Sequence, residues 1–381
     1  MPSPRPEWTL SFLEEKRKHS DPYADPIAAQ IIEQHKQGEL KDFYQVFVLP
    51  HHVDYEALSP FLREYFETTA QLPKWADRAK IKRGEEVFRL HGLMAGMLLQ
   101  AKSLPECYAC WRGAKVLFNT GRMTGVDHLI RLTRRLMETA QFVINVMAED
   151  GLEPEGVGIV AAQKVRLIHA AIRYYIRENE WDAEKYGEPI NQEDMAGTLM
   201  SFSALILEGF EMLGIELSIE DKDAYIHSWA VVGHIMGLHD DLIPHNYEEA
   251  MWLGRTILDQ QKGHSMEGVA LTEAILLFME EHVPLKWLLG SFPRSMVRFL
   301  IGREMADYLE IKPPNRLVTW LTDLFLPRAF ASKHRLHPSR IWALLLERFK
   351  MRLQQGMILK YNDYKKVHFY IPPSLREDWG L

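Results

Sequence analysis

The residue best suited to bind a cofactor or to take part in catalysis is His169, which lies in the segment 161–177 (AAQKVRLIHAAIRYYIR). Apolar residues recur there at three- and four-residue steps, at Val165, Ile168, Ile172 and Ile176. This spacing predicts an amphipathic helix. Polar residues fall on the other side, which we expect to face solvent: Gln163, Arg166, Arg173 and Arg177. At about 100° per residue, His169 lies at the edge of the apolar stripe. A histidine in this position is either a packed core residue or a ligand that points into a pocket.

A second group of residues suited to chemistry lies in the segment 126–147, whose pattern predicts another strong helix. Arg135 and Thr139 are four residues apart and share one helix face, and Glu138 is three residues from Arg135. An arginine beside an apolar face needs a partner if it is buried. These side chains could therefore form the polar part of a dry pocket. The alternative, which the residues alone favour, is that Arg135 and Glu138 form an ordinary surface ion pair.

Two further clusters contain the residue types of metal sites. The first places imidazoles and carboxylates within twelve residues, at His234, His239, Asp240, Asp241 and His245. Gly237 and Pro244 interrupt this segment, so we interpret it as a helix C-terminus followed by a capped turn rather than as a metal site. The second is the C-x-x-C of Cys107 and Cys110, which lacks a second pair. We interpret it as two buried free thiols.

Several kinds of active site are excluded by their missing motifs. The chain has no G-x-S-x-G, no P-loop and no H-E-x-x-H. None of its 16 histidines follows a glutamate by three residues, so the Glu-x-x-His ligands of a di-iron bundle are missing too. A cofactor that needs a single protein ligand remains. Haem is such a cofactor, because its iron commonly binds one neutral imidazole beside an apolar cavity.

The elements that must position these residues are helices, and the chain is predicted to be all-α. Helical patterns cover the segments 26–37, 126–147, 161–177, 192–213 and 219–236. Asn191 is the expected N-cap of the fourth of these. Strand signals are nearly absent, with one exception at 367–371 (VHFYI). We expect long helices packed around a shared core.

Composition and charge limit the class of protein. The 381 residues are 47% hydrophobic with two cysteines, which is typical of a globular protein in a reducing compartment. Without a signal sequence or an apolar run of about 18 residues, we expect a soluble, cytoplasmic protein. The net charge is −7, yet residues 286–381 carry 17 lysines and arginines against 8 acidic residues. We expect this region to pack on the acidic remainder, with peripheral membrane contact through 341–350 as the alternative and no nucleic-acid partner.

Seven short motifs follow one another along the middle of the chain: LPKWAD (72–77), SLPECYA (103–109), VLFNTGRM (116–123), RRLMETAQFV (134–143), VRLIHAAIRYY (165–175), YGEPINQEDM (186–195) and VVGHIMGLHDDLIP (231–244). In this order they resemble the latex clearing protein, or rubber oxygenase, family. Its relatives include a fungal membrane-bound oxygenase that shortens a farnesyl side chain. The resemblance implies a globin-like helical core that holds haem b over residues 72–284. An N-terminal helical extension (1–71) precedes this core, and a basic helical extension (285–381) packs on it.

The resemblance also implies roles for individual residues. His169 takes the place of the proximal iron ligand. The family's distal motif, Arg-x-x-Lys-Thr, is similar to the run from Arg135 to Thr139, with Glu138 in place of the lysine. That lysine can ligate the iron in a closed state of rubber oxygenases. The family's acidic base has no counterpart in this sequence, where Asn119 and Thr120 lie in the corresponding region.

The leading hypothesis is a haem-dependent oxygenase that acts with dioxygen on a small hydrophobic substrate of an isoprenoid or unsaturated lipid-like kind. His169 and Arg135 would bind the cofactor, and Arg135 would stabilise negative charge on oxygen. Glu138, with its pKa raised in a dry pocket, would move a proton together with Thr139. One alternative is a haem sensor, carrier or peroxidase-like protein of the same fold. Another is a helical interaction protein without cofactor, whose basic C-terminal region is the working surface. The oligomeric state stays unknown.

Overall fold

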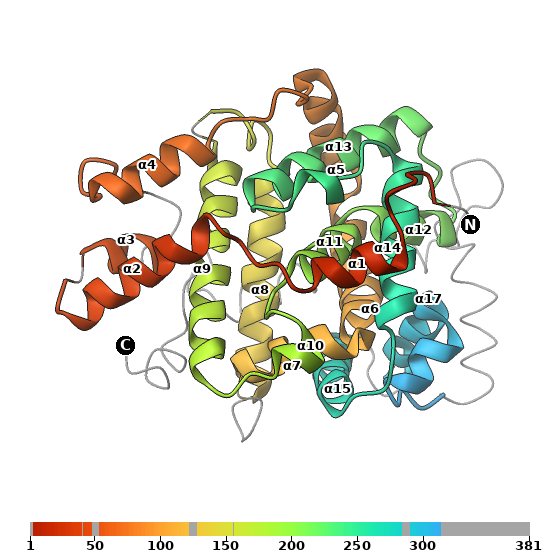
Figure 1. Cartoon of the computed structure of the whole chain (residues 1–381). Coiled ribbons are helices and arrows are strands. Elements are labelled where there is room, and N and C mark those ends of the chain that lie inside the picture. Colours follow the sequence, from red (N-terminus) through yellow and green to blue (C-terminus); the bar gives the residue numbers. More distant parts are fainter. Residues whose placement is uncertain are drawn as a thin grey trace.

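The computed structural model describes residues 3–39, 41–47, 53–121, 128–154, 156–283 and 290–313, and throughout them the protein is all-α (Figure 1). The elements are α1 (Leu10–Lys16), α2 (Ala24–Lys36), α3 (Lys41–Phe47), α4 (Pro60–Thr69), α5 (Arg78–Leu98), the π-helix η1 (Leu99–Ser103), α6 (Leu104–Ala109), α7 (Trp111–Gly121), α8 (His128–Val146), α9 (Val157–Glu178), α10 (Ala183–Tyr186), α11 (Gln192–Phe202), α12 (Ala204–Met212), α13 (Ile219–Ile235), the 3-10 turn η2 (Asp240–Leu242), α14 (Tyr247–Gln261), α15 (Met266–His282) and α17 (Phe292–Tyr308). The predicted fold class is confirmed.

Polar side chains begin several of these helices. Asn191 accepts the N–H of Asp194 at 2.9 Å at the start of α11, as predicted. Ser218 accepts the N–H of Asp221 at 3.1 Å at the start of α13. Each cap satisfies a backbone donor that has no partner inside its helix. The helix starts are therefore set by local sequence.

The helix predicted over residues 192–213 is in fact two helices. Ser203 leaves helical geometry, with φ −117° and ψ −87°, and so separates α11 from α12. Its hydroxyl donates to the carbonyl of Leu199 at 2.7 Å, a local bond of the kind that bends helices. The prediction of one continuous helix was wrong because apolar residues continue on both sides of Ser203, so the pattern contains no break.

The end of α13 agrees with the interpretation of the histidine-rich segment. Gly237 has φ +83°, the conformation that commonly ends a helix. The N–H of Leu238 then donates to the carbonyl of Gly233 at 2.9 Å. Within the described residues, no group of three or more His, Cys, Asp or Glu side chains is arranged to hold a metal ion. The predicted helix C-terminus at Gly237 is confirmed.

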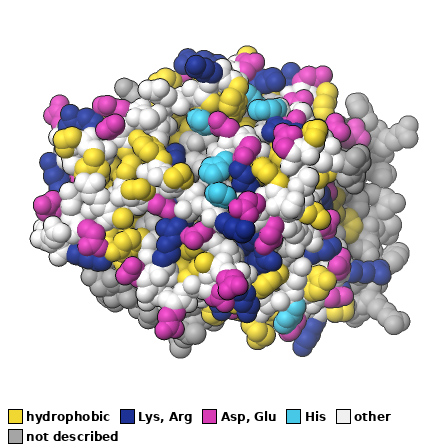
Figure 2. All heavy atoms as spheres, viewed as in Figure 1, with side chains coloured by type: hydrophobic (Ala, Val, Ile, Leu, Met, Phe, Trp, Pro, Cys, Tyr) yellow, Lys and Arg dark blue, Asp and Glu magenta, His cyan; other side chains and the backbone are white. Residues whose placement is uncertain are grey.

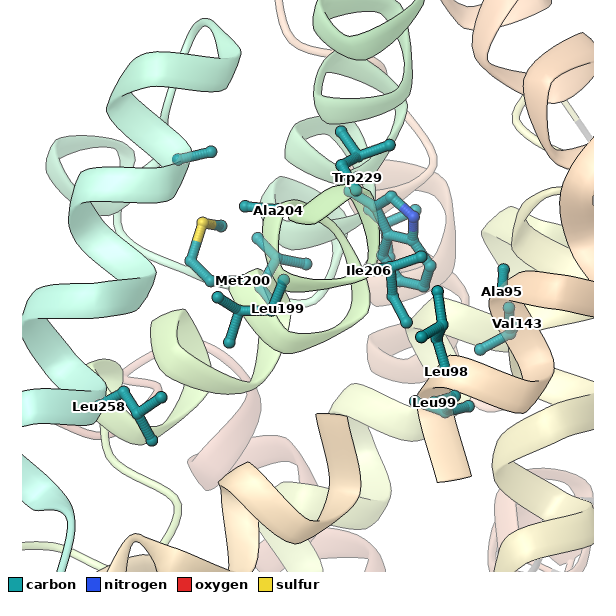
Figure 3. Packing of buried hydrophobic residues seen from close by; sticks show 14 of the residues in the cluster. Ala95, Leu98, Leu99, Val143, Leu199, Met200, Ala204, Ile206, Trp229 and Leu258 are labelled. Atoms are coloured by element: carbon teal, nitrogen blue, oxygen red, sulfur yellow. The ribbon is translucent and has the colours of Figure 1, made fainter. Parts of the chain in front are cut away.

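The main core forms where α5, α11, α12, α13, α14 and α15 pack together. Figure 3 shows Leu98 of α5, Ile206 of α12 and Trp229 of α13 among the side chains of this core. α5 and α13 run side by side. A Cβ at Gly84 of α5 would lie 2.2 Å from Oγ of Ser228, so glycine is required for this close approach. α17 packs on η1, α6 and α15.

A second core lies between α9 and the N-terminal helices α2, α3 and α4 (Figure 1). α9 therefore contributes to two cores, with Val165 in the main core and Leu167 and Ile168 in the second. The expectation that the polar side of this helix faces solvent was wrong for most of it. Gln163 and Arg173 are at most 1% exposed, because α2 and α4 cover them.

Long-range ion pairs make this burial possible. Nε of Arg166 lies 2.6 Å from Oδ2 of Asp21, and Nε of Arg173 lies 2.7 Å from Oδ1 of Asp25. Gln163 donates to the carbonyl of Phe66 at 2.7 Å. Buried polar groups are costly unless they are bonded in this way. The N-terminal segment thus supplies the ion-pair and hydrogen-bond partners of these buried side chains of α9.

Positive and negative side chains are interspersed on the face shown in Figure 2. Among the helices of the described ranges, none has the length and apolar character needed to cross a membrane. The cytoplasmic location, the peripheral membrane contact and the lack of a nucleic-acid partner stay predictions, as do the domain boundaries at 71/72 and 284/285. Residues 341–350 and 367–371 lie outside the described residues.

Candidate active site

A cavity of about 310 Å³ lies within the main core, bordered by α6, α7, α8, α9, α11, α13 and α14. Its wall is mostly apolar, and its volume lies at the lower end of the range of roughly 300–1,000 Å³ seen for ligand and cofactor sites. The residues predicted to form a site all line it: Arg135, Glu138, Thr139 and His169. The packing of α8 against α9 brings the two predicted groups together.

His169 faces this cavity from α9. It shares one face with Val165 and Ile172, which also line the cavity and lie four residues before and three residues after it. Its Nδ1 atom is buried and makes no hydrogen bond in the described part of the chain. Burial lowers the pKa of the imidazole from 6.5 to about 3, and the positive charge of Arg173 adds to this effect. His169 is therefore neutral at physiological pH, which is the form that binds metals.

Glu138 lies inside the protein rather than on its surface, and Arg135 is half-buried. Glu138 is 4% exposed, and Nη1 of Arg135 donates to the carbonyl of Leu117 at 3.0 Å. Burial lowers the pKa of Arg135, while Tyr108 and Glu138 act in the opposite direction. The surface ion pair favoured by the residues alone was wrong, because α7, α9 and α15 pack around α8.

The other residues named from the family's distal side have different positions. Thr139 lies one turn after Arg135 and lines the cavity. Asn119, near the end of α7, is exposed and is not part of the cavity wall. The side chain of Thr120 lies outside the described residues. The roles assigned to the predicted site residues stay predictions, although their positions in one cavity agree with them.

Sequence reasoning missed several polar residues of the cavity wall. Tyr108 of α6, Asp194 of α11 and Trp229 of α13 also line the cavity. Tyr108 and Asp194 belong to the motifs SLPECYA and YGEPINQEDM. These motifs were the available signal, but neither residue lies on an apolar stripe that would single it out.

The carboxylates of the wall are bonded to cations. Glu106 is fully buried, and its Oε2 lies 2.8 Å from Nζ of Lys102. Burial raises the pKa of Glu106, and Lys102 opposes that rise. Oδ1 of Asp194 lies 2.8 Å from Nη1 of Arg17, which reaches the site from the end of α1. The wall therefore carries paired charges.

Cys107 and Cys110 also line the cavity, and both are free thiols. Burial raises the pKa of Cys107 to about 11 and that of Cys110 well above its usual value of 9. Neither cysteine is therefore a thiolate at neutral pH, and the interpretation of the C-x-x-C as unreactive thiols is consistent with their surroundings.

Comparison with known proteins identifies the family and the fold. The family described as "ER-bound oxygenase mpaB/B'/Rubber oxygenase, catalytic domain" matches residues 83–354. The rubber oxygenase of Streptomyces sp. (strain K30) is 25% identical over 357 residues, which are 92% of this chain and 85% of that protein. A solved structure of latex clearing protein LCP in the closed state has a TM-score of 0.76 at 24% identity. It covers 94% of this chain and 95% of its own, and shows the same fold.

The family match spans well over half of the chain, so this protein belongs to the ER-bound oxygenase and rubber oxygenase catalytic-domain family. The resemblance seen in the seven sequence motifs is confirmed. The protein is accordingly an oxygenase, and the reading of the chain as an interaction protein without enzymatic activity is set aside.

Proposed function

We propose that this oxygenase uses haem b, held by His169, to add oxygen from dioxygen to a small, neutral, hydrophobic substrate of an isoprenoid or unsaturated lipid-like kind. The observation that carries the proposal is the setting of His169. Its imidazole is neutral, Nδ1 has no partner in the described residues, and the ring lines the same cavity as Arg135, Glu138 and Thr139. A packed core histidine would have a hydrogen-bond partner.

The residues of the cavity fit a haem group. Haem iron requires one neutral imidazole from the protein, and the rest of its pocket is apolar with few polar groups. His169 meets the first requirement, while Leu136, Phe142 and Ile172 belong to an apolar wall. When bound, haem supplies an iron centre that exchanges electrons with dioxygen, a reaction that amino-acid side chains do not perform.

The chain's own residues position and stabilise the reacting groups. The bond from Arg135 to the carbonyl of Leu117 fixes the guanidinium before substrate arrives. A fixed positive charge in a dry site stabilises negative charge that develops on oxygen more strongly than water does. Glu138 holds or accepts a proton beside it, and the hydroxyl of Thr139 can donate a hydrogen bond. The apolar wall excludes water from the site.

The paired charges of the wall favour a neutral substrate. A carboxylate or diphosphate substrate would require a cation that is not already matched by an acidic side chain. Two carboxylates of the described cavity wall already hold the cations next to them: Glu106 is bonded to Lys102, and Asp194 is bonded to Arg17. Arg135 lies in the electrostatic field of Glu138. An anionic substrate would disrupt these pairs, at a cost that a neutral prenyl compound avoids.

Reconstitution with haemin tests the cofactor. The wild-type protein should show a Soret band at one haem per chain, and His169→Ala should lose most of it. His234→Ala is the matched control, because that histidine lies near the protein surface and bonds Asp240 at 3.2 Å. It should keep the wild-type band. A wild-type spectrum in His169→Ala would refute the assignment.

Oxygen uptake tests the substrate class. The haem-loaded, reduced protein is mixed with a neutral prenyl alcohol or with the diphosphate of the same chain length. Faster oxygen consumption with the alcohol is expected, together with an oxygenated product by mass spectrometry. Preference for the diphosphate would contradict the charge argument.

A further inference from the structure

Tyr108 is a buried polar residue of the cavity wall that the proposed function does not yet use. It lies on α6, is 5% exposed and lines the cavity. No hydrogen bond joins its hydroxyl to another residue in the part of the chain that the structure describes, and the side chain borders the cavity. A buried hydroxyl usually finds a partner, so this atom is suited to a ligand that enters the cavity.

Tyr108 and Arg135 line the same cavity and interact electrostatically. Arg135 is the charge that acts most strongly on Tyr108, and Tyr108 is the group that acts most strongly on Arg135 after burial itself. Arg135 also acts on the imidazole of His169. These three side chains, from α6, α8 and α9, line one cavity.

The chemistry of Tyr108 is that of a donor. Burial raises the pKa of its phenol, so the hydroxyl keeps its proton at neutral pH. A protonated phenol and a guanidinium that line one cavity are both hydrogen-bond donors to a ligand inside it. Such a pair recognises an oxygen atom or a small anion rather than an apolar group.

We propose that the Tyr108 hydroxyl is a second hydrogen-bond donor, beside Arg135, to the small ligand that binds the cofactor held by His169. The inference rests on the proposed haem site and adds a residue to its ligand-binding side. Tyr108 then helps to hold oxygen in place, while Arg135 supplies the charge. The alternative is that the ring only fills space, in which case the hydroxyl has no effect on ligand binding.

Tyr108→Phe separates these two possibilities, because it removes one oxygen atom and no hydrogen bond to a described residue. The measurement is the affinity of the ferric, haem-loaded protein for fluoride, a small anion that accepts hydrogen bonds, followed by absorption. One lost hydrogen bond should weaken binding about two- to tenfold. The Soret band and the midpoint of thermal unfolding should stay at their wild-type values.

Tyr225→Phe is the matched control. Tyr225 is also buried, but its hydroxyl donates to the carbonyl of Phe202 at 3.3 Å, and its ring is not part of the cavity wall. Its fluoride affinity should equal that of the wild type. If Tyr108→Phe binds fluoride as tightly as the wild type with an intact Soret band, the role of Tyr108 is overturned and the haem site stands. If the wild type takes up no haem, or His169→Ala keeps the wild-type band, both the haem site at His169 and the role of Tyr108 are refuted.

Discussion

Acid should destabilise this protein through His169, by an amount that follows from the burial of its imidazole. The ordinary pKa is 6.5, and the fold lowers it to about 3. Between these values the unfolded chain binds the proton and the folded chain does not. The stabilising contribution of the neutral imidazole is therefore complete above the unfolded pKa, and it is lost as the pH falls from about 6.5 towards 3.

At pH 5.5 the protonated form of His169 in the unfolded chain is about tenfold more abundant than the neutral form. His169 should therefore lower the free energy of unfolding by about 1.4 kcal/mol relative to its value at pH 7.5. Urea denaturation at both pH values measures this in wild-type protein and in His169→Leu, each free of haem. The variant should lose about 1.4 kcal/mol less of its unfolding free energy between the two pH values. The other histidines are common to both proteins and cancel in the difference. Equal losses in the two proteins would refute the argument.

Two further substitutions test the cavity wall. Nζ of the fully buried Lys102 lies 2.8 Å from carboxylate oxygens of both Glu106 and Glu208, so Lys102→Met should lower the free energy of unfolding in urea by about 3–5 kcal/mol. A loss below about 1 kcal/mol would show that these carboxylates do not depend on the lysine. Glu138→Lys restores the lysine of the family motif, and Arg135 nearby favours the neutral amine. The ferric haem spectrum should then become six-coordinate and low-spin, whereas an unchanged spectrum would mean that position 138 does not reach the iron.

Local features of the fold could be predicted because their causes are local. The cap at Asn191 and the turn at Gly237 each depend on residues within a few positions. The spacing of apolar residues likewise placed His169 at the edge of the apolar stripe of α9, without deciding between a packed core residue and a ligand in a pocket. Ser203 shows the limit of such patterns, because its helix break comes from a hydroxyl bond to Leu199 that leaves the apolar sequence unchanged.

The candidate site could be predicted only in part, because its residues meet through tertiary packing. Arg135 and His169 were each singled out by their own helix, but helical spacing cannot show that α8 and α9 face one cavity. Tyr108 is 27 positions before Arg135 and lies on a short helix of six residues, so no periodicity connects the two. The family motif around Tyr108 marks the segment without stating which side chain enters the cavity.

The packing of α9 connects the N-terminal helices to the candidate site. His169 has no hydrogen-bond acceptor at Nδ1 in the described residues, so the direction of its ring depends on packing rather than on a fixed bond. That packing is held on the adjoining face of α9, where Asp21 and Asp25 bind Arg166 and Arg173. Loss of either aspartate would leave an arginine buried without a carboxylate, and α9 would shift to reach solvent. The N-terminal segment, none of whose described residues lines the cavity, therefore helps to hold the helix that carries His169 in place.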